Sequence, residues 1–254
     1  MKNYVISLSS SLDRRKHINS EFSRENINFE FFDAITPINA IDIVKQDFPN
    51  LDIKGVSAGE LACIASHIAV WKIALNTNLE YIAVFEDDIF LSNTARDFLC
   101  NSTWVDSEWS ILKLETFYEK VILSSEKNII KNHNIQVLKT AHFGAAGYIL
   151  SKKAIHELFA YIHELNVISP LDHMLFSDMI RFNKKTIYQI NPAICIQEKI
   201  LKKEVELSNS LNEYREQFLP KKLKINFSQK ILREFFRLHK QLRLALFARK
   251  ISFK

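Results

Sequence analysis

Three adjacent carboxylates, Glu86, Asp87 and Asp88, directly follow an apolar run at residues 81–85. A continuous apolar run of this kind is typical of a strand that is buried on both faces. Side chains alternate along an extended chain, so we expect Glu86 and Asp88 to point one way and Asp87 the other. Ligands of α/β sheets bind outside the carboxyl ends of the strands. The triplet therefore offers oxygen ligands for a divalent cation that holds a diphosphate. A solvated acidic turn is the alternative, and the triplet alone does not separate the two.

The four glycines lie in two short segments, at Gly55 and Gly59 and at Gly144 and Gly147. In the second segment, residues 142–148, small central side chains would let the backbone approach a ligand closely. A glycine-tolerant strand packed under a helix explains the two intervening alanines at least as well. The segment is therefore a candidate ligand-binding wall with a structural alternative.

Four further polar residues have both a functional and a structural interpretation. Glu60 has capping-box spacing from Ser57, which by itself explains a glutamate there. His67 lies two helical turns after Glu60, and a lone helical histidine is more often structural than catalytic. Asp172 falls in the first turn of an expected helix, where the helix dipole favours a carboxylate. Arg14 follows the first expected strand, where a guanidinium could bind phosphate.

The elements that must position these residues alternate in type. Strands are expected at residues 2–8, 29–32, 81–85, 111–114, 143–150 and 186–190, and helices at 11–24, 58–75, 151–165 and 171–181. The strand, helix, strand opening favours a parallel sheet. The sequence therefore predicts an α/β domain with a mostly parallel central sheet over residues 1–197. Residues 198–254 are expected to form a charged linker and a basic helical C-terminal tail.

Composition places the chain among ordinary globular proteins, with 254 residues, 47% of them hydrophobic and 25% charged. The three cysteines, Cys63, Cys100 and Cys195, are odd in number and far apart, so we expect neither a disulfide framework nor a structural zinc site. A reducing cytoplasm fits best. The apolar run at the N-terminus is too short for a signal peptide, and we find no run near the roughly 20 apolar residues that span a bilayer.

Charge is unevenly distributed along the chain. Residues 220–254 contain 11 Lys or Arg and one acid, a net +10, so residues 1–219 carry −5 of the total +5. Apolar residues at 231, 235, 238, 242 and 245 repeat as in an amphipathic helix. We therefore expect residues 221–254 to bind an anionic membrane surface at the cytoplasmic face; a terminal helix docked on the domain is the alternative. Nucleic acid is not expected, because the acidic body would repel phosphate.

Taken together, these segments resemble glycosyltransferase family 25, the bacterial lipooligosaccharide galactosyltransferase type, whose domain also occurs in collagen galactosyltransferases. The resemblance covers roughly residues 2–197. It rests on Tyr4-Val5-Ile6-Ser7-Leu8 with Arg14-Arg15, Gly59-Glu60-Leu61-Ala62-Cys63 with Ser66-His67, Val84-Phe85-Glu86-Asp87-Asp88, Gly144-Ala145-Ala146-Gly147-Tyr148-Ile149-Leu150-Ser151, and Leu171-Asp172. It implies a GT-A-like nucleotide-sugar-binding domain, a UDP-sugar donor, usually UDP-galactose, a lipooligosaccharide acceptor and inversion at the anomeric carbon.

The resemblance also implies roles for individual residues. Asp88 and Glu86 would hold Mn²⁺ or Mg²⁺, and Asp172 is the candidate catalytic base, with metal binding or sugar positioning as alternatives. The candidate donor-binding residues are Leu8, Arg14, Glu60, His67, Asp87, Gly144 and Gly147. The segment between the two glycines is smaller than the family leads us to expect, which leaves the choice between galactose and glucose open.

Two other functions compete with this interpretation. A metal-dependent phosphohydrolase or nuclease could use the same carboxylates, but such sites draw several ligands from dispersed motifs and the histidines supply no obvious set. A non-catalytic nucleotide-binding module that anchors a membrane complex through its tail would bind UDP without turnover.

Overall fold

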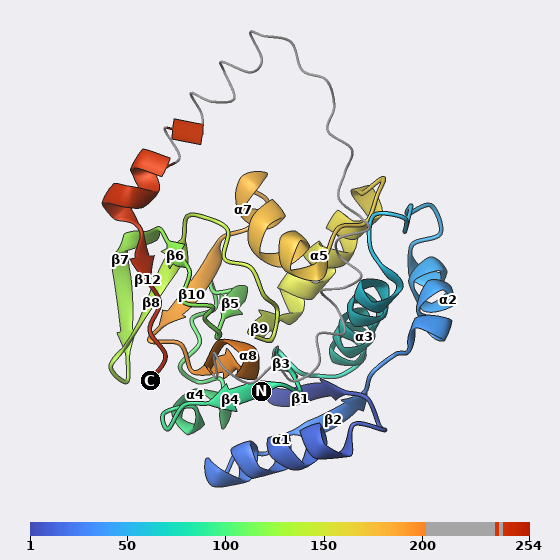
Figure 1. Cartoon of the computed structure of the whole chain (residues 1–254), viewed down its shortest axis with the longest axis horizontal. Coiled ribbons are helices and arrows are strands. Elements are labelled where there is room, and N and C mark those ends of the chain that lie inside the picture. The colour runs from blue at the N-terminus through green and yellow to red at the C-terminus, as the bar shows by residue number, and fades with distance from the viewer. Residues whose placement is uncertain (202–236, 239–240) are drawn as a thin grey trace, which may run out of the picture.

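The computed structural model describes residues 1–201, 237–238 and 241–254 of the chain. Its centre is an eight-stranded sheet with the strand order β2-β1-β3-β9-β5-β10-β8-β7 (Figure 1). These strands are β1 (Lys2–Ser7), β2 (Glu30–Asp33), β3 (Tyr81–Glu86), β5 (Ile111–Lys113), β7 (Leu123–Ile130), β8 (His133–Leu138), β9 (Gly147–Ser151) and β10 (Ile187–Asn191). Two small sheets pair β4 (Ile89–Leu91) with β11 (Cys195–Gln197) and β6 (Lys120–Val121) with β12 (Arg249–Lys250).

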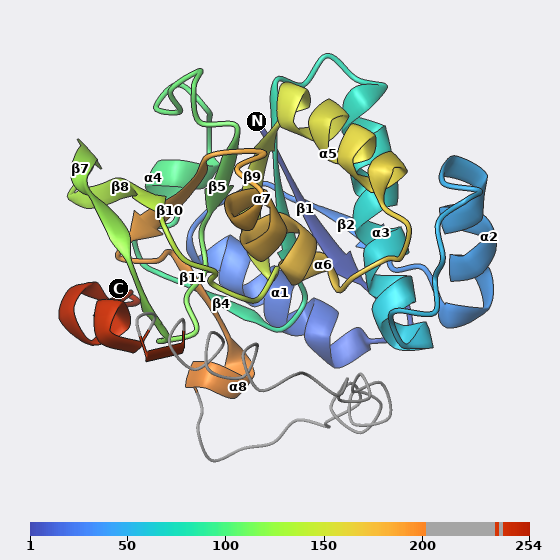
Figure 2. The same cartoon turned by 90° about the horizontal axis from the view of Figure 1, so that it is seen from above.

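Helices cover both faces of the central sheet (Figure 2). One face packs against α2 (Pro37–Asp47), α3 (Ala58–Leu75), α5 (Lys152–Glu164) and the continuous helical segment α6 (Leu171–His173), η1 (Met174–Asp178) and α7 (Met179–Arg181). The other face packs against α1 (Leu12–Arg24) and α4 (Arg96–Leu99). A short helix, α8 (Glu198–Leu201), follows β11.

Strand β3 is buried on both faces, as the apolar run predicted. Ile82 and Val84 belong to one core cluster, whereas Ala83 and Phe85 belong to the other. All four side chains are at most 1% exposed. The acidic triplet therefore begins where a fully buried strand leaves the core.

The central sheet is mixed, so the prediction of a mostly parallel sheet was wrong. Strand β1 runs parallel to β2 and β3, and β5 runs parallel to β10, but β9 lies antiparallel between β3 and β5. The hairpin β7–β8 adds two further antiparallel pairings at the edge. No helix separates β8 from β9 in the described chain, and a direct connection of this kind lets a strand enter in the opposite direction.

Helix α3 has the predicted bounds, and its start has the predicted cap. The Ser57 hydroxyl accepts a hydrogen bond from the Glu60 amide, and the Glu60 carboxylate accepts one from the Ser57 amide. By length and composition α3 could cross a membrane, contrary to the expectation that no segment would approach such a span, but 61% of it is buried inside the protein. Its apolar character therefore belongs to its place in the core, between α2 and α5.

Other predicted elements differ at their ends or were missed. The strand expected at residues 143–150 begins only at Gly147, so residues 143–146 form an irregular segment. Helix α2 and the β7–β8 hairpin were not predicted. The segment 171–181 is helical as expected, although its middle turn is a π-helix, a feature frequent at functional sites.

The end of the chain packs against the body. Strand β12 pairs with β6, and the buried side chain of Ile251 enters the core. The Thr116 hydroxyl donates to the Ile251 carbonyl at 2.9 Å, and the Ala193 amide donates to the Ser252 carbonyl at 2.7 Å. Residues 237–238 and 241–247 are helical, while the rest of the predicted tail helix lies outside the described residues. The domain boundary at residue 197 stays a prediction.

Candidate functional site

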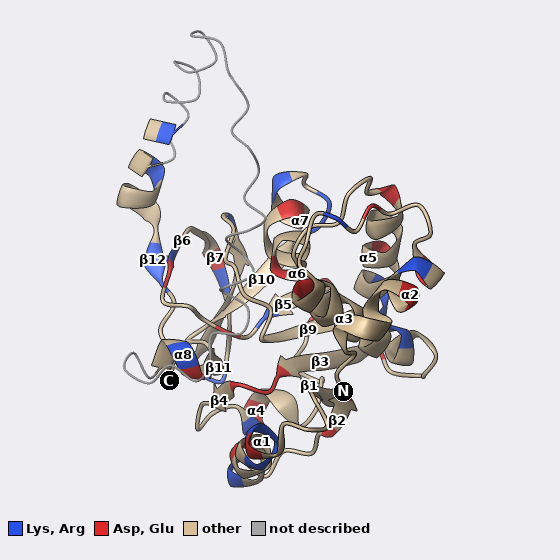
Figure 3. Ribbon diagram, turned by 45° about the vertical axis from the view of Figure 1, so that its right-hand side comes forward, with Lys and Arg blue, Asp and Glu red and all other residues tan. Residues whose placement is uncertain are grey.

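A pocket of about 270 Å³ opens where β3, the start of α3, the 143–145 segment and α6 meet the end of β11. In Figure 3 the turn between β3 and β4 and the short helix α6 both carry the red of acidic residues. The pocket is lined by Glu60, Cys63, Glu86, Phe117, Glu119, Phe143, Gly144, Ala145, Pro170, Leu171, Asp172, Gln197 and Lys199. The pocket therefore brings together four of the predicted site residues, Glu60, Glu86, Gly144 and Asp172.

Glu86 and Asp88 point one way and Asp87 the other, as predicted, although only Glu86 lies in β3 and the two aspartates form the turn to β4. Glu86 accepts a hydrogen bond from the side-chain amide of Gln197 at 3.0 Å, and the two carboxylate oxygens of Asp88 accept from the same amide at 3.1 and 3.2 Å. Asp87 turns the other way, where it accepts from the Ser7 hydroxyl and the Arg14 guanidinium, both at 2.7 Å. The first and third carboxylates thus converge, while the second links the turn to α1.

The convergence is electrostatically unfavourable without a cation. Burial and, to a smaller extent, the carboxylates of Asp88 and Glu115 raise the pKa of Glu86 to about 8. Burial also raises the pKa of Asp88, against the opposing effect of Lys199. Burial by itself would lower the pKa of Arg14, but the neighbouring carboxylates outweigh it and leave that pKa raised. The carboxylates around Glu86, which lines the pocket, are therefore poised to attract positive charge.

The residues around Glu86 fit a hard divalent cation. The Gln197 amide nitrogen donates to both the Glu86 and the Asp88 carboxylate, so one positively polarised group can contact the two carboxylates at once. The other end of the same amide, Oε1, is buried and has no hydrogen-bond partner among the described residues. Rotating the amide by half a turn would present that carbonyl oxygen to the cation, which completes a set of oxygen donors suited to Mg²⁺ or Mn²⁺.

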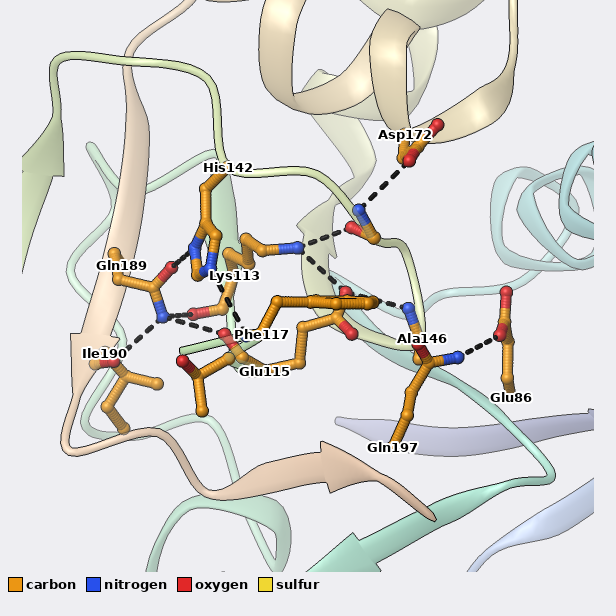
Figure 4. Close-up of polar contacts among 12 residues, drawn as sticks. Glu86, Lys113, Glu115, Phe117, His142, Ala146, Asp172, Gln189, Ile190 and Gln197 are labelled. Carbon is orange, nitrogen blue, oxygen red and sulfur yellow. Dashed lines mark hydrogen bonds and ion pairs between the residues drawn. The ribbon is translucent and has the colours of Figure 1, made fainter. Parts of the chain in front are cut away.

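A buried ion pair holds the glycine segment against the pocket (Figure 4). Lys113 and Glu115 are fully buried and lie 2.8 Å apart. Lys113 also donates to the Gly144 carbonyl, and Glu115 accepts from the Ala146 amide at 2.9 Å. The backbone of residues 144–146 is therefore fixed by two side chains, one at the end of β5 and one two residues beyond it.

The two glycines of the segment have different reasons to be glycine. Gly144 has φ = +89°, and a Cβ there would lie 1.9 Å from the Phe117 ring, so both backbone and space exclude other residues. Gly147 faces away from the pocket, because a Cβ would lie 2.3 Å from the Cys195 sulfur. The close-approach argument thus applies to Gly144, while Gly147 permits strand packing.

Asp172 reaches the pocket from α6 and is held in place there. One of its carboxylate oxygens accepts from the Gly144 amide at 3.1 Å and the other from the His173 amide at 3.0 Å. A carboxylate has about four acceptor sites, so these bonds leave it able to accept a proton from a ligand. The structure therefore brings Asp172 and Glu86 to the same pocket, which spacing alone did not establish.

His67 is buried behind the pocket wall rather than exposed in it. Its side chain is 1% exposed, and Nδ1 lies 2.5 Å from the Tyr148 hydroxyl. The same hydroxyl accepts from the Trp71 indole at 3.1 Å. Burial lowers the pKa of His67 to about 3, so the ring is neutral at physiological pH.

Several predicted residues lie near the pocket without lining it. Leu8 is 41% exposed at the end of β1, and Arg14 contacts Asp87 rather than the cavity. The residues absent from the lining are Leu8, Arg14, His67, Asp87, Asp88 and Gly147. Their roles toward a donor stay predictions.

Sequence reasoning missed the residues that complete the site. Gln197 and Lys199 come from the distant end of the domain, and no motif marked them. Lys113 carried a usable signal, because a charge inside an apolar strand needs a buried partner and Glu115 lies two residues on, on the same face.

Residues 1–175 match the family described as glycosyltransferase family 25 (LPS biosynthesis protein). The lipooligosaccharide biosynthesis protein lic2B of Haemophilus influenzae is 34% identical over 256 residues, which cover 92% of this chain and 94% of that protein. The lacto-N-neotetraose biosynthesis glycosyltransferase LgtE of Neisseria meningitidis serogroup B is 37% identical over 232 residues, covering 85% and 82%. Among solved structures, a glycosyltransferase involved in the glycosylation of the major capsid of PBCV-1 has 8% identity and a TM-score of 0.42, over 86% of this chain and 98% of that chain.

The family match covers well over half of the chain and includes the capped start of α3, the acidic triplet and Asp172. Both relatives align over more than four fifths of this chain and of their own length. The resemblance identified from the motifs is thereby confirmed. The chain is a glycosyltransferase and belongs to glycosyltransferase family 25.

Proposed function

We propose that this glycosyltransferase moves a hexose, with galactose as the first candidate, from a UDP-sugar onto a lipooligosaccharide acceptor, with inversion at the anomeric carbon. The observation that carries the proposal is the convergence of Glu86 and Asp88 on the Gln197 amide, beside a pocket that Glu86, Gln197 and Asp172 line. The acceptor class is supported by the relatives, one named for lipooligosaccharide and one for lacto-N-neotetraose biosynthesis.

We propose that Glu86 and Asp88, with the Gln197 carbonyl as a third ligand, hold Mn²⁺ or Mg²⁺. A divalent cation bound there would neutralise the charge that develops on the diphosphate as UDP departs. Lys199 lines the same pocket and lies close enough to both carboxylates to oppose the rise of their pKa values. Its ammonium group is therefore placed to pair with a second phosphate oxygen of the donor.

Asp172 takes the role of catalytic base in this proposal. Inversion requires the acceptor hydroxyl to attack opposite the diphosphate, with a carboxylate within hydrogen-bond reach to accept its proton. The Gly144 and His173 amides orient Asp172, while the nearby side chains of Phe117, Phe143 and Leu171 give the cavity apolar walls that limit water. Excluding water favours transfer to the acceptor over hydrolysis of the donor.

We further propose that the C-terminal helical residues rest on the anionic cytoplasmic face of the membrane. Leu238, Leu242, Leu246 and Phe247 are between 60% and 66% exposed. Exposed basic side chains accompany them, at 243 in the helix and at 249 and 250 in β12, and this mixture of apolar and basic groups suits an anionic membrane surface. Pairing of β12 with β6 ties the end of this segment to the catalytic body.

The membrane proposal is tested by vesicle sedimentation. Wild type should bind vesicles containing anionic lipid, lose binding at high salt, and bind far less after Leu242→Asp with Leu246→Asp. The matched control is Ile129→Asp, which makes the same kind of change on the edge strand β7, where the Ile129 side chain is 62% exposed. Equal binding by all three proteins would refute the proposal.

The transfer proposal is tested by UDP release from UDP-galactose, UDP-glucose and UDP-N-acetylglucosamine, with truncated lipooligosaccharide as acceptor and with Mn²⁺ or EDTA. We expect release from one donor that requires the cation and disappears in Asp88→Asn. Asp97→Asn is the matched control, because that carboxylate is 46% exposed and pairs with Lys131 at the surface.

Other outcomes identify the competing functions. UDP binding without turnover of any donor would favour a non-catalytic nucleotide-binding module. Cation-dependent release of phosphate without an acceptor would indicate a phosphohydrolase. Failure to bind UDP at all would refute the assignment of the pocket as a donor site.

A further inference from the structure

Glu86 borders a second cluster of metal-ligating groups on the α3 side of the pocket. The Cys63 sulfur, a ring nitrogen of His67 and a Glu86 carboxylate oxygen all lie within 4.8 Å of one another. Cys63 and His67 are four residues apart on α3, so their side chains lie on the same helical face. Glu86 meets that face from the end of β3, which packs against α3.

His67 supplies an independent indication that a ligand belongs there. Its Nε2 is buried and has no hydrogen-bond partner among the described residues. A buried imidazole nitrogen without a partner is costly, and in native structures such groups call for a ligand, an ion or a water. Nδ1 is already 2.5 Å from the Tyr148 hydroxyl, which Trp71 holds in place. A metal-binding histidine commonly donates its other ring N–H to an acceptor, and the Tyr148 hydroxyl oxygen can accept that bond in the tautomer with the proton on Nδ1.

The ligand types of the two clusters select different cations. Glu86, Asp88 and Gln197 offer only oxygen, which suits Mg²⁺ and Mn²⁺. Cys63, His67 and Glu86 combine a thiol, an imidazole and a carboxylate, the set that Zn²⁺ prefers. Ligand atoms around tetrahedral zinc lie roughly 3.5 Å apart, so modest side-chain rotations within the cluster would bring the three atoms to bonding distance.

A metal ion held by these three residues would be open to the pocket on one side. His67 is buried, whereas Cys63 and Glu86 are only partly buried and line the pocket. A metal held by three protein ligands would therefore keep a fourth position facing the cavity, where the proposed donor diphosphate lies.

We propose that Cys63, His67 and Glu86 form a zinc-binding site distinct from the oxygen-only cation site, and that the two sites share Glu86. Zinc bound there withdraws Glu86 from the oxygen-only site and so inhibits cation-dependent transfer. The inhibitory part rests on the proposed function, whereas zinc binding itself does not.

Zinc binding is measured on the purified full chain in buffer free of Mn²⁺ and Mg²⁺, by competition with a chromophoric zinc indicator. We expect one Zn²⁺ per chain in wild type, in Asp88→Asn and in the control Cys100→Ser, which changes an exposed cysteine. Cys63→Ser should bind zinc at least about tenfold more weakly. Circular dichroism of each variant verifies that it is folded.

Loading with Co²⁺ gives a second measurement. Its absorption spectrum distinguishes a Cys63 thiolate that binds the metal from a Cys63 that has only a structural role. Wild type loaded with Co²⁺ should show a thiolate-to-metal charge-transfer band, which Cys63→Ser should lack and Asp88→Asn should retain. Wild-type zinc affinity in folded Cys63→Ser, loss of zinc in Asp88→Asn alone, or absence of zinc binding by wild type would each overturn the proposal.

Transfer assays separate this inference from the proposed function. If zinc binds as expected but no donor turns over, the zinc site stands and the transferase proposal fails. If transfer is measurable, zinc should inhibit wild type more strongly than Cys63→Ser at the same Mn²⁺ concentration. Equal inhibition of the two proteins would refute the sharing of Glu86.

Discussion

Replacing Lys113 by methionine should be among the most destabilising single changes in the described part of the chain. The ammonium group lies 2.8 Å from the Glu115 carboxylate, both side chains are fully buried, and the same group donates to the Gly144 carbonyl. It also lies 4.1 Å from the centre of the Phe176 ring. Lys113→Met removes all three interactions and leaves a carboxylate without its cation in the core.

The expected loss in free energy of unfolding is about 3–5 kcal/mol, the cost of breaking a buried ion pair from one side. Lys184→Met is the control, because Lys184 pairs with Glu164 at the surface, where the two side chains are 46% and 64% exposed. A surface pair contributes about 0–1 kcal/mol. Urea unfolding followed by circular dichroism measures both variants at neutral pH.

The stability of Lys113→Met should also depend on pH, because the charge of Glu115 does. Burial raises the pKa of Glu115 and Lys113 opposes that rise, so Lys113→Met should raise it further. A carboxyl whose pKa is raised by folding stabilises the fold at low pH and loses that contribution as pH rises. The deficit of Lys113→Met should therefore be smaller at pH 5 than at pH 8.

Adding Glu115→Gln should restore most of the stability, because the amide keeps an acceptor for the Ala146 N–H and carries no charge. The interpretation of a charge-dominated core pair would be refuted if Lys113→Met lost no more stability than Lys184→Met. Failure of the second substitution to recover stability would contradict it as well.

Three further outcomes follow from the site. Gln197→Leu should weaken Mn²⁺ binding at least about tenfold by electron paramagnetic resonance titration, a loss of about 1.4 kcal/mol, while Gln197→Glu keeps it; unchanged affinity in Gln197→Leu would exclude the amide as a ligand. Gly144→Ala should cost about 1–3 kcal/mol in urea unfolding and weaken UDP binding, because φ is +89° and the new methyl meets Phe117; wild-type stability would contradict the clash. Burial lowers the pKa of His142 to about 3, whereas in the unfolded chain this residue takes up a proton below about pH 6.5. The free energy of unfolding should therefore fall by about 2 kcal/mol between pH 8 and pH 5 because of this group. His142→Gln should show a correspondingly flatter pH dependence of stability.

Local sequence was sufficient for the elements whose signals are local. The 3.6-residue repeat and the Ser57–Glu60 cap predicted α3 with its correct bounds, because a capped helix end satisfies the backbone groups it exposes. The unbroken apolar run predicted β3, since only a strand covered on both faces buries consecutive side chains. The opposite directions of Asp87 and of the other two carboxylates were predicted as well, although the two aspartates lie in the turn after β3 and not in an extended strand.

Strand direction could not be predicted in the same way. The antiparallel entry of β9 between β3 and β5 depends on where the segment after β8 crosses the sheet, and no residue in that segment specifies it. This entry places Gly147 opposite Phe85 and so brings the glycine segment beside the acidic triplet. The pocket wall is thus a product of sheet topology.

By itself the sequence determined the carboxylates, the helix that carries Glu60, Cys63 and His67, and the family to which the chain belongs. Only the tertiary structure decided which of these groups meet. Gln197 reaches Glu86 across 111 residues, and Asp172 reaches Gly144 across 28. Contacts of that kind depend on strand order and packing, because a side chain's chemistry is local whereas its neighbours are chosen by the burial of the whole core.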